Sequence, residues 1–444
     1  MHDTEVLHLV LKFPLGLFAL LIIVWGLIKY VKDKKKLFFV SFFVSLIMPY
    51  VFRFNILPGF IYDAPMLITN VLNVYIIYSY RNEKVYKRKD TNMLRFIIWM
   101  YLLTSMIIPA IRIFIIHDYN IDFGAWGSQL VLTSFQWISF AWILLKIRID
   151  KKFIDMFAKV LFIFGLIVAL DGIFGYIFGF WKEVIVMVGD KNLNRISSFV
   201  GGGVDGALRV VVIGLISSVY LYFENNKKIY YFYLLLTSVF ILYASERTGY
   251  IIYIVTILMI YKYQKFNLKY IFAVLLFVLV IILSFDNIFL LVEGMFRSNR
   301  PQEIFDANSM NQRYERWVAI YEVIVNHPFH FIFGFGVNNV IPYMSYYSLT
   351  NSQIILVSTL HNNYLDIIIE GGIMGLIYII LFYIMSIKSI IIVFFKRGMQ
   401  YYFSVTFIIV VILMYQNTST VRDQLMIFAL VIIMNINQIK EVRK

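Results

Sequence analysis

Long apolar stretches recur along the whole chain, and they restrict its fold more than any other feature. Stretches of about 17 to 25 apolar residues have the length that an α-helix needs to cross the hydrocarbon core of a bilayer. The composition agrees, because 61% of the 444 residues are hydrophobic and only 15% are charged. Within a bilayer, backbone amides must be hydrogen-bonded inside the protein, which long helices achieve. The sequence therefore predicts an all-α, polytopic transmembrane helical bundle.

Basic residues occur in alternate short links between the apolar stretches, and they predict the orientation of the spans. The formal net charge is +14, and the lysines and arginines gather at residues 29–36, 81–89, 146–152, 226–228, 262–265, 396–397 and 440–444. This is the positive-inside pattern, so the charge requires no nucleic-acid partner. It places the N-terminus outside the cell and the C-terminus inside.

About 12 to 13 spans are expected in one membrane-embedded domain that covers residues 1–444. They are predicted near residues 8–29, 37–54, 61–80, 94–116, 126–147, 156–180, 205–223, 229–245, 249–262, 269–292, 371–394, 402–417 and 423–438. A twelve-span form with both ends inside is the alternative. The first apolar run lacks a basic leader and a small-residue cleavage site, so no cleavable signal peptide is expected. The chain has no cysteine, which excludes disulfides and thiolate metal sites.

Two outer loops, at 182–204 and 293–360, hold many of the polar residues on the side opposite the basic links. A loop as long as 293–360 is usually functional or disordered. We expect a helix over 313–325 within it, because its apolar residues have helical spacing and the chain then stops at Asn326-His327-Pro328.

Arginines of these outer segments are candidates for binding an anion. Arg313 and Arg316 lie three residues apart and share a helical face; the alternative is a solvated basic face. Arg247 sits in a very short turn between two apolar spans, where an ionisable residue is costly and usually functional or paired. The alternatives there are a pair with Glu246 or a side chain that snorkels to the interface. Arg195, in the outer loop at 182–204, is a further candidate for binding an anion.

Arg209 lies inside an apolar run and therefore also needs an anion or a carbonyl as a partner. Asp171, toward the outer end of a predicted span, is a candidate partner for one of the arginines.

His361 stands just before an apolar run, where water meets lipid, and histidine accepts protons near neutral pH. The alternative is a histidine that merely ends a loop. Residues 361–370 are expected to form a short helix or ledge at the outer interface, and Gly371-Gly372 allows a bend after it.

Taken in order, these pieces form a family pattern. An outer-loop arginine, a Ser-x-Arg turn and an Arg-Trp pair are followed by His-Pro, Gly-x-Gly, and His-Asn-x-Tyr-Leu before Glu-x-Gly-Ile-x-Gly. They occur here at Arg195, Ser245–Gly249, Arg316-Trp317, His327-Pro328, Gly334–Gly336, His361–Leu365 and Glu370–Gly375. The combination resembles the O-antigen polymerase and O-antigen ligase superfamily of bacterial envelope glycosyltransferases. Two departures from the pattern are Glu246, where a small or uncharged residue is usual, and the absence of Pro-Asn near Gly201.

The resemblance implies transfer of a glycan from a polyprenyl diphosphate, such as undecaprenyl diphosphate, to a sugar hydroxyl. The reaction would take place at the outer face of the bacterial cytoplasmic membrane, without metal or cofactor, on a fold similar to the lipid-linked C-type glycosyltransferases. A general base must then deprotonate the acceptor hydroxyl, which suits His361. Cations must stabilise the departing diphosphate, which suits the guanidinium groups, and the candidates are Arg247, Arg316, Arg195, Arg209 and Arg313.

Within this class a polymerase is the main prediction, extending a capsule, O-antigen or related cell-envelope polysaccharide from lipid-linked repeat units. Its partners would be membrane lipid, a flippase and a chain-length regulator. A ligase that passes the glycan to a lipid or cell-wall acceptor is the first alternative. A flippase or other transporter would have charged residues deep within several spans and short outer loops. A purely structural membrane protein would lose nothing when His361 alone is changed.

Overall fold

The computed structural model describes much of the predicted bundle. The described residues are 21–51, 182–196 and 428–433, each with short gaps, together with 59–84, 91–115, 127, 135–178, 198, 203–225, 227–244, 247–263, 321, 325, 332–334, 363–396 and 398–414.

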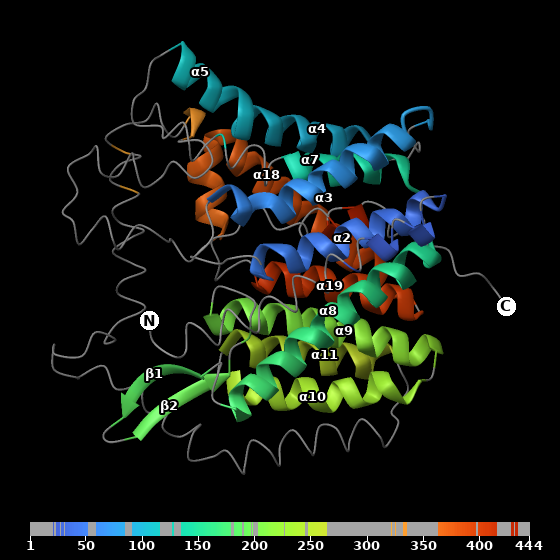
Figure 1. Ribbon diagram of the computed structural model, residues 1–444, viewed down its shortest axis with the longest axis vertical. Helices are drawn as coiled ribbons and strands as arrows, with labels where there is room; N and C mark the ends of the chain where they lie inside the picture. The colour runs from blue at the N-terminus through green and yellow to red at the C-terminus, as the bar shows by residue number, and fades with distance from the viewer. Residues whose placement is uncertain are drawn as a thin grey trace.

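The predicted all-α fold is confirmed, and most predicted spans correspond to helices (Figure 1). In chain order the elements are α2 (Lys34–Val51), α3 (Gly59–Ser79), α4 (Thr91–Leu102), the π-helix η1 (Leu103–Ile107), α5 (Ile108–Phe114), α7 (Phe135–Lys146), α8 (Lys151–Ile177), β1 (Lys182–Val188), β2 (Lys191–Ile196), α9 (Gly203–Asn225), α10 (Lys228–Ala244), α11 (Arg247–Tyr263), α18 (Asn363–Phe394) and α19 (Met399–Met414).

Three helical segments among the described residues are long and apolar enough to cross a membrane: Lys151–Ile177, Ala207–Asn225 and Ile367–Phe394. This agrees with a polytopic membrane protein. The predicted span 269–292 lies outside the described residues, and the spans 8–29 and 423–438 are described only in part. The total of about 12 to 13 spans therefore stays a prediction.

The helices pack side by side around the antiparallel pair α8 and α9 (Figure 1). Helices α10 and α11 flank α9 on one side, and α2 and α3 continue the bundle on the other side of α8. Helix α19 packs against α9, α11 and α18, and α18 in turn contacts α4 and η1.

An aromatic cluster fills the centre of the bundle around Phe428. Its ring stacks on Phe157 of α8, with 4.5 Å between the ring centroids, and lies 4.3 Å from the ring of Phe42 of α2. Phe140 of α7 also lies beside it. All four rings are buried, so residues from far apart in the chain form one core.

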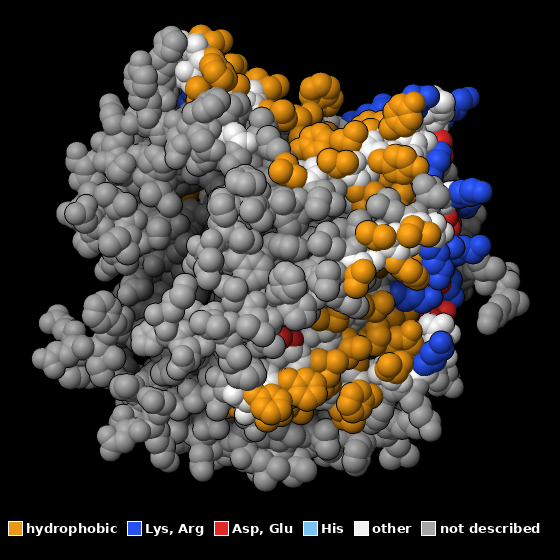
Figure 2. Space-filling model, viewed as in Figure 1, with side chains coloured by type: hydrophobic (Ala, Val, Ile, Leu, Met, Phe, Trp, Pro, Cys, Tyr) orange, Lys and Arg blue, Asp and Glu red, His pale blue; other side chains and the backbone are white. Residues whose placement is uncertain are grey.

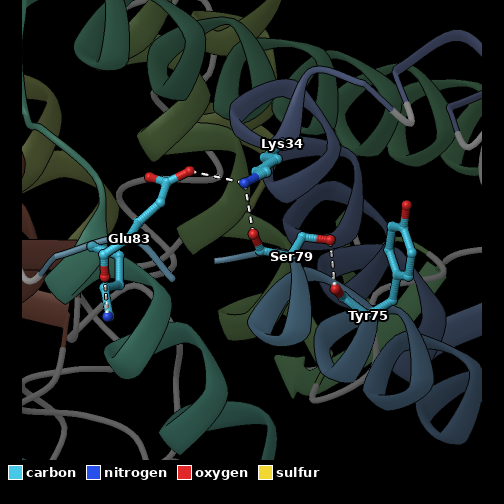
Figure 3. Close-up of polar contacts among 5 residues, drawn as sticks. Lys34, Tyr75, Ser79 and Glu83 are labelled. Atoms are coloured by element: carbon cyan, nitrogen blue, oxygen red, sulfur yellow. Dashed lines mark hydrogen bonds and ion pairs between the residues drawn. The ribbon is translucent and has the colours of Figure 1, made fainter. Parts of the chain in front are cut away.

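The described parts of the basic links lie at one end of the described bundle, which we call the basic end (Figure 2). The link at 440–444 lies outside the described residues. Lys34 at the start of α2 donates to the Ser79 carbonyl at 2.6 Å and pairs with Glu83 at 2.9 Å (Figure 3). The Ser79 hydroxyl in turn donates to the Tyr75 carbonyl at 2.8 Å. These contacts join the beginning of α2 to the end of α3.

Asp150 joins the beginning of α2 to the beginning of α8. Its carboxylate accepts from the Phe153 amide at 2.9 Å, which caps the N-terminus of α8, and pairs with Lys35 at 3.0 Å. Burial raises the pKa of the Asp150 carboxyl, but the hydrogen bonds from Phe153 and Lys35 outweigh burial and lower the pKa below its usual value. The carboxyl is therefore charged at neutral pH, and the pair with Lys35 persists there.

The outer loop at 182–204 contains a feature that the sequence analysis did not predict. Strands β1 and β2 pair as an antiparallel hairpin, from Lys182 opposite Ile196 to Val188 opposite Lys191, with an irregularity in register between Val184 and Val186. The signal was present in the sequence: β-branched residues at 184–188 precede Gly189-Asp190, a dipeptide typical of two-residue hairpin turns. Figure 1 shows the hairpin at the end of the bundle away from the basic end, which we call the hairpin end.

Candidate active site

The hairpin end collects the beginnings of three helices. Because α9, α11 and α18 each run toward the basic end, their first residues, Gly203, Arg247 and Asn363, lie at the hairpin end (Figure 1). The N-terminus of a helix carries a partial positive charge and unpaired N–H groups. This end of the bundle therefore suits a negatively charged ligand.

Arg247 is the first residue of α11, and its turn lies against α9 because Gly249 permits a close approach. A Cβ atom built on Gly249 would lie 2.7 Å from Cδ2 of Leu208, which is closer than a side chain normally allows. The next residue of α9 is Arg209, which is half-buried. Glycine at 249 thus leaves room for the Leu208 side chain between the first turn of α11 and α9.

We expect Gly249→Val to separate α11 from α9 at this point. Forcing bulk into packed structure typically costs about 1–3 kcal/mol of stability, and any activity that depends on Arg247 should fall. The measurements are thermal unfolding of the purified protein and transfer activity. Gly127→Val is the matched control, because a Cβ on Gly127 meets no atom within 4 Å. Equal thermal stability and equal activity of the two variants would show that neither depends on the packing of Gly249 against Leu208.

Arg195 lies on β2, opposite Glu183 in the register of the hairpin. Strand β2 packs against α8 and α10, and α10 leads directly into the turn before Arg247. Ser198, just after β2, donates from Oγ to Oδ2 of Asp171 on α8 at 2.8 Å. This contact ties the hairpin to α8. The predicted pairing of Asp171 with an arginine stays a prediction.

Three of the candidate arginines, Arg195, Arg209 and Arg247, thus lie on elements that pack together at the hairpin end. Arg313 and Arg316 lie outside the described residues. Of the helix predicted over 313–325, only Tyr321 and Val325 are described, and both have helical backbone.

His361 and Asn362 lie outside the described residues, immediately before Asn363 begins α18. The bend predicted at Gly371-Gly372 is confirmed, because Gly372 interrupts α18 with φ 58° and ψ −141°, a conformation that favours glycine. The bend folds the chain so tightly that a Cβ on Gly375 would lie 2.0 Å from the Ile367 carbonyl oxygen. The first part of α18 therefore forms a separate helical segment at the hairpin end.

Arg112 is a buried charged residue near this segment that the sequence analysis missed. Its Nη1 donates to the Gly334 carbonyl at 2.7 Å, and its side chain is 4% exposed. Gly334 in turn lies directly against the bend, since a Cβ there would be 2.2 Å from the Glu370 carbonyl oxygen. An ionisable residue inside the apolar run 108–115 was the signal that could have identified it.

The described residues thus present two groups at the hairpin end. The arginine group lies on α9, α11 and β2, and the bend group lies on α5, α18 and Gly334. Helix α19 packs against both α18 and the pair α9 and α11, and so connects them. Among the described residues, no set of three or more His, Cys, Asp or Glu side chains is placed to hold a metal ion.

Comparison with known families agrees with the resemblance seen in the sequence. A helical bundle with several membrane-spanning helices defines a polytopic membrane protein. Residues 232–380 match the sequence model of the O-antigen ligase family, which supports the resemblance to the O-antigen ligase and polymerase superfamily. Together with the apolar helices, the match supports a bacterial membrane protein of a glycan-transferring type. No curated protein sequence matches the chain significantly.

The matched segment runs from α10 through α11 to the middle of α18. It includes Arg247, Arg313, Arg316, Gly334, His361 and Gly372. Arg195, Arg209 and Arg112 lie before it.

Proposed function

We propose that this protein is a polysaccharide polymerase that joins polyprenyl-diphosphate-linked repeat units at the outer face of the bacterial cytoplasmic membrane. The observation that carries the proposal is the family match, which covers His361 and Arg247. The position of Arg247 and of the start of α18 at the hairpin end supports it.

In the proposed reaction the acceptor hydroxyl of one lipid-linked glycan attacks the anomeric carbon of the other. The bond from that carbon to the diphosphate oxygen breaks, and the diphosphate leaves with the electron pair. His361 takes the hydroxyl proton as general base. Arg247 and Arg316, helped by Arg195, Arg209 and Arg313, hold the diphosphate through charge-assisted hydrogen bonds. The helix N-termini at the hairpin end favour the same negative charge.

A ligase is the second candidate, because the matched family is described by that activity. The two differ only in the acceptor: a second lipid-linked repeat unit for a polymerase, and a different lipid or a cell-wall component for a ligase. In both cases the donor is the same class of molecule, and the arginines and His361 have the same tasks.

Purified protein mixed with lipid-linked repeat units, in the presence of a chelator, tests the proposal. A ladder of products that grows by one repeat unit at a time supports the polymerase. Transfer only after a separate acceptor is added favours the ligase. Loss of wild-type activity on chelation contradicts the metal-free reaction, and no transfer to either acceptor contradicts the proposed class of activity.

The sidedness of the protein gives a separate prediction. Because the basic end should face the cytoplasm, a cysteine that replaces Lys34 should be protected from a membrane-impermeant thiol reagent applied outside the cell. A cysteine that replaces Arg316 should be labelled. The chain has no native cysteine, so each signal comes from one position. Labelling of residue 34 together with protection of residue 316 would show that the orientation is opposite to the predicted one.

A further inference from the structure

We propose that Arg112 is a positioning residue. It fixes Gly334 on the bend of α18 and thereby sets the place of Asn363–Gly371, the helical segment that follows His361. The proposal rests on the proposed function only where it links this segment to glycan transfer.

The surroundings of Arg112 show that its guanidinium is turned into the protein. Its neighbours Ile111 and Ile115 are 41% and 71% exposed, whereas Arg112 is 4% exposed. The π-helix η1 directly precedes α5, which has Pro109 in its first turn, and η1 packs against α18. Insertions of this kind rotate the residues that follow them and often mark functional positions. Here α5 presents Arg112 to the interior and Ile111 to the surface.

Burying a guanidinium costs free energy unless the group is hydrogen-bonded. Arg112 lies in the last turn of α5, where the partial negative charge of the helix C-terminus favours a cation. Its bond to the Gly334 carbonyl joins positions that are 222 residues apart in the chain. A contact between such distant segments, made by a charge inside an apolar environment, is a strong constraint on where Gly334 can lie.

Gly334 transmits that constraint to α18. It has φ 73°, and the space beside its Cα is filled by backbone atoms: a Cβ there would meet the Glu370 carbonyl oxygen at 2.2 Å and the Gly372 nitrogen at 2.7 Å. Backbone atoms cannot move aside as a flexible side chain would. Gly334 therefore packs directly against the bend, and its hydrogen bond with Arg112 holds it there.

The bend separates α18 into a first segment, Asn363–Gly371, and the longer apolar segment after it. The first segment begins two residues after His361. A general base must lie within hydrogen-bonding reach of the proton that it removes, and a displacement of about 1 Å can cost about a hundredfold in rate. Losing the contact at Gly334 should therefore impair the chemical step and leave the binding of the donor intact.

The first test measures amide hydrogen exchange in the purified protein and does not depend on activity. Arg112→Met removes the donor but keeps an apolar side chain of similar length. We expect faster exchange in residues 332–334 and 363–371 and unchanged exchange in α8 and α9. Arg81→Met is the matched control, because Arg81 is exposed and lies at the basic end over the Tyr78 ring. An even increase across all helices, or no change in 363–371, overturns the proposal.

The second test separates kcat from KM with lipid-linked donor. For Arg112→Met we expect kcat to fall by about tenfold to a hundredfold and KM to change less than about twofold. Gly334→Ala should show the same pattern, and the double variant should lose no more than the worse single variant, since both disturb one contact. Arg112→Lys should recover part of kcat because it retains a cationic donor.

A raised KM with unchanged kcat would instead make Arg112 a donor-binding residue and overturn the positioning role. If the wild-type protein transfers no glycan at all, the proposed function fails. The exchange difference between Arg112→Met and Arg81→Met still decides whether Arg112 positions the first segment of α18.

Discussion

Replacing His361 with alanine is expected to reduce glycan transfer by about a hundredfold to ten-thousandfold, which is the usual contribution of a general base. The protein should still insert into the membrane and bind the lipid-linked donor, because the arginines that we propose to hold the diphosphate are unchanged. The measurement is single-turnover transfer with purified lipid-linked repeat units, together with donor binding. His2→Ala is the matched control, since His2 lies outside the segment that matches the family.

The pH dependence of the wild-type protein extends this prediction. A histidine base works only when neutral, so activity should fall as the pH is lowered and the imidazole becomes protonated. His361→Ala should lose this dependence along with most of its activity. Near wild-type turnover of His361→Ala would show that His361 is not the base.

Replacing Arg247 with alanine is expected to reduce transfer by about tenfold to a hundredfold, because one charge-assisted hydrogen bond is worth about 1.5–3 kcal/mol. Loss of a bidentate contact would cost more. Arg247→Lys should recover little, since an ammonium group lacks the planar fork that matches two phosphate oxygens. The measurement is kcat/KM for the lipid-linked donor in each variant.

Arg148→Ala is the control for the loss of one positive charge, because Arg148 is exposed and lies at the basic end beside Asp150. It should leave transfer unchanged. Full activity of Arg247→Lys would contradict bidentate binding and favour a role for Arg247 as a simple interfacial anchor.

The sequence predicted those features of the fold that depend on local pattern. The length of each apolar stretch predicted the spans, the alternation of basic links predicted the basic end, and the Gly371-Gly372 pair predicted the bend in α18. Each of these follows from residues that are close together in the chain. The hairpin of β1 and β2 belongs with them in principle, since Gly189-Asp190 is a turn dipeptide, but strands this short give a weak signal between long apolar helices.

The contact between Arg112 and Gly334 could not be predicted from a local sequence pattern. Nothing near Arg112 in the sequence indicates that its partner is a carbonyl 222 residues away. The packing of Gly249 on Leu208 is likewise a property of two helices and of neither alone. For the site, the sequence could name the arginines and His361 as candidates, but only the packing showed that β2, α9 and α11, which carry Arg195, Arg209 and Arg247, each pack against α10.

The place of Phe428 in the aromatic core has a consequence for how the protein is made. Its partners, Phe42 on α2, Phe140 on α7 and Phe157 on α8, are synthesised long before it. Until residue 428 has been synthesised and inserted, these three rings lack the ring on which they pack, and packed interiors tolerate voids poorly. Helices α2, α7 and α8 should therefore complete their packing only after the segment that carries Phe428 has been inserted.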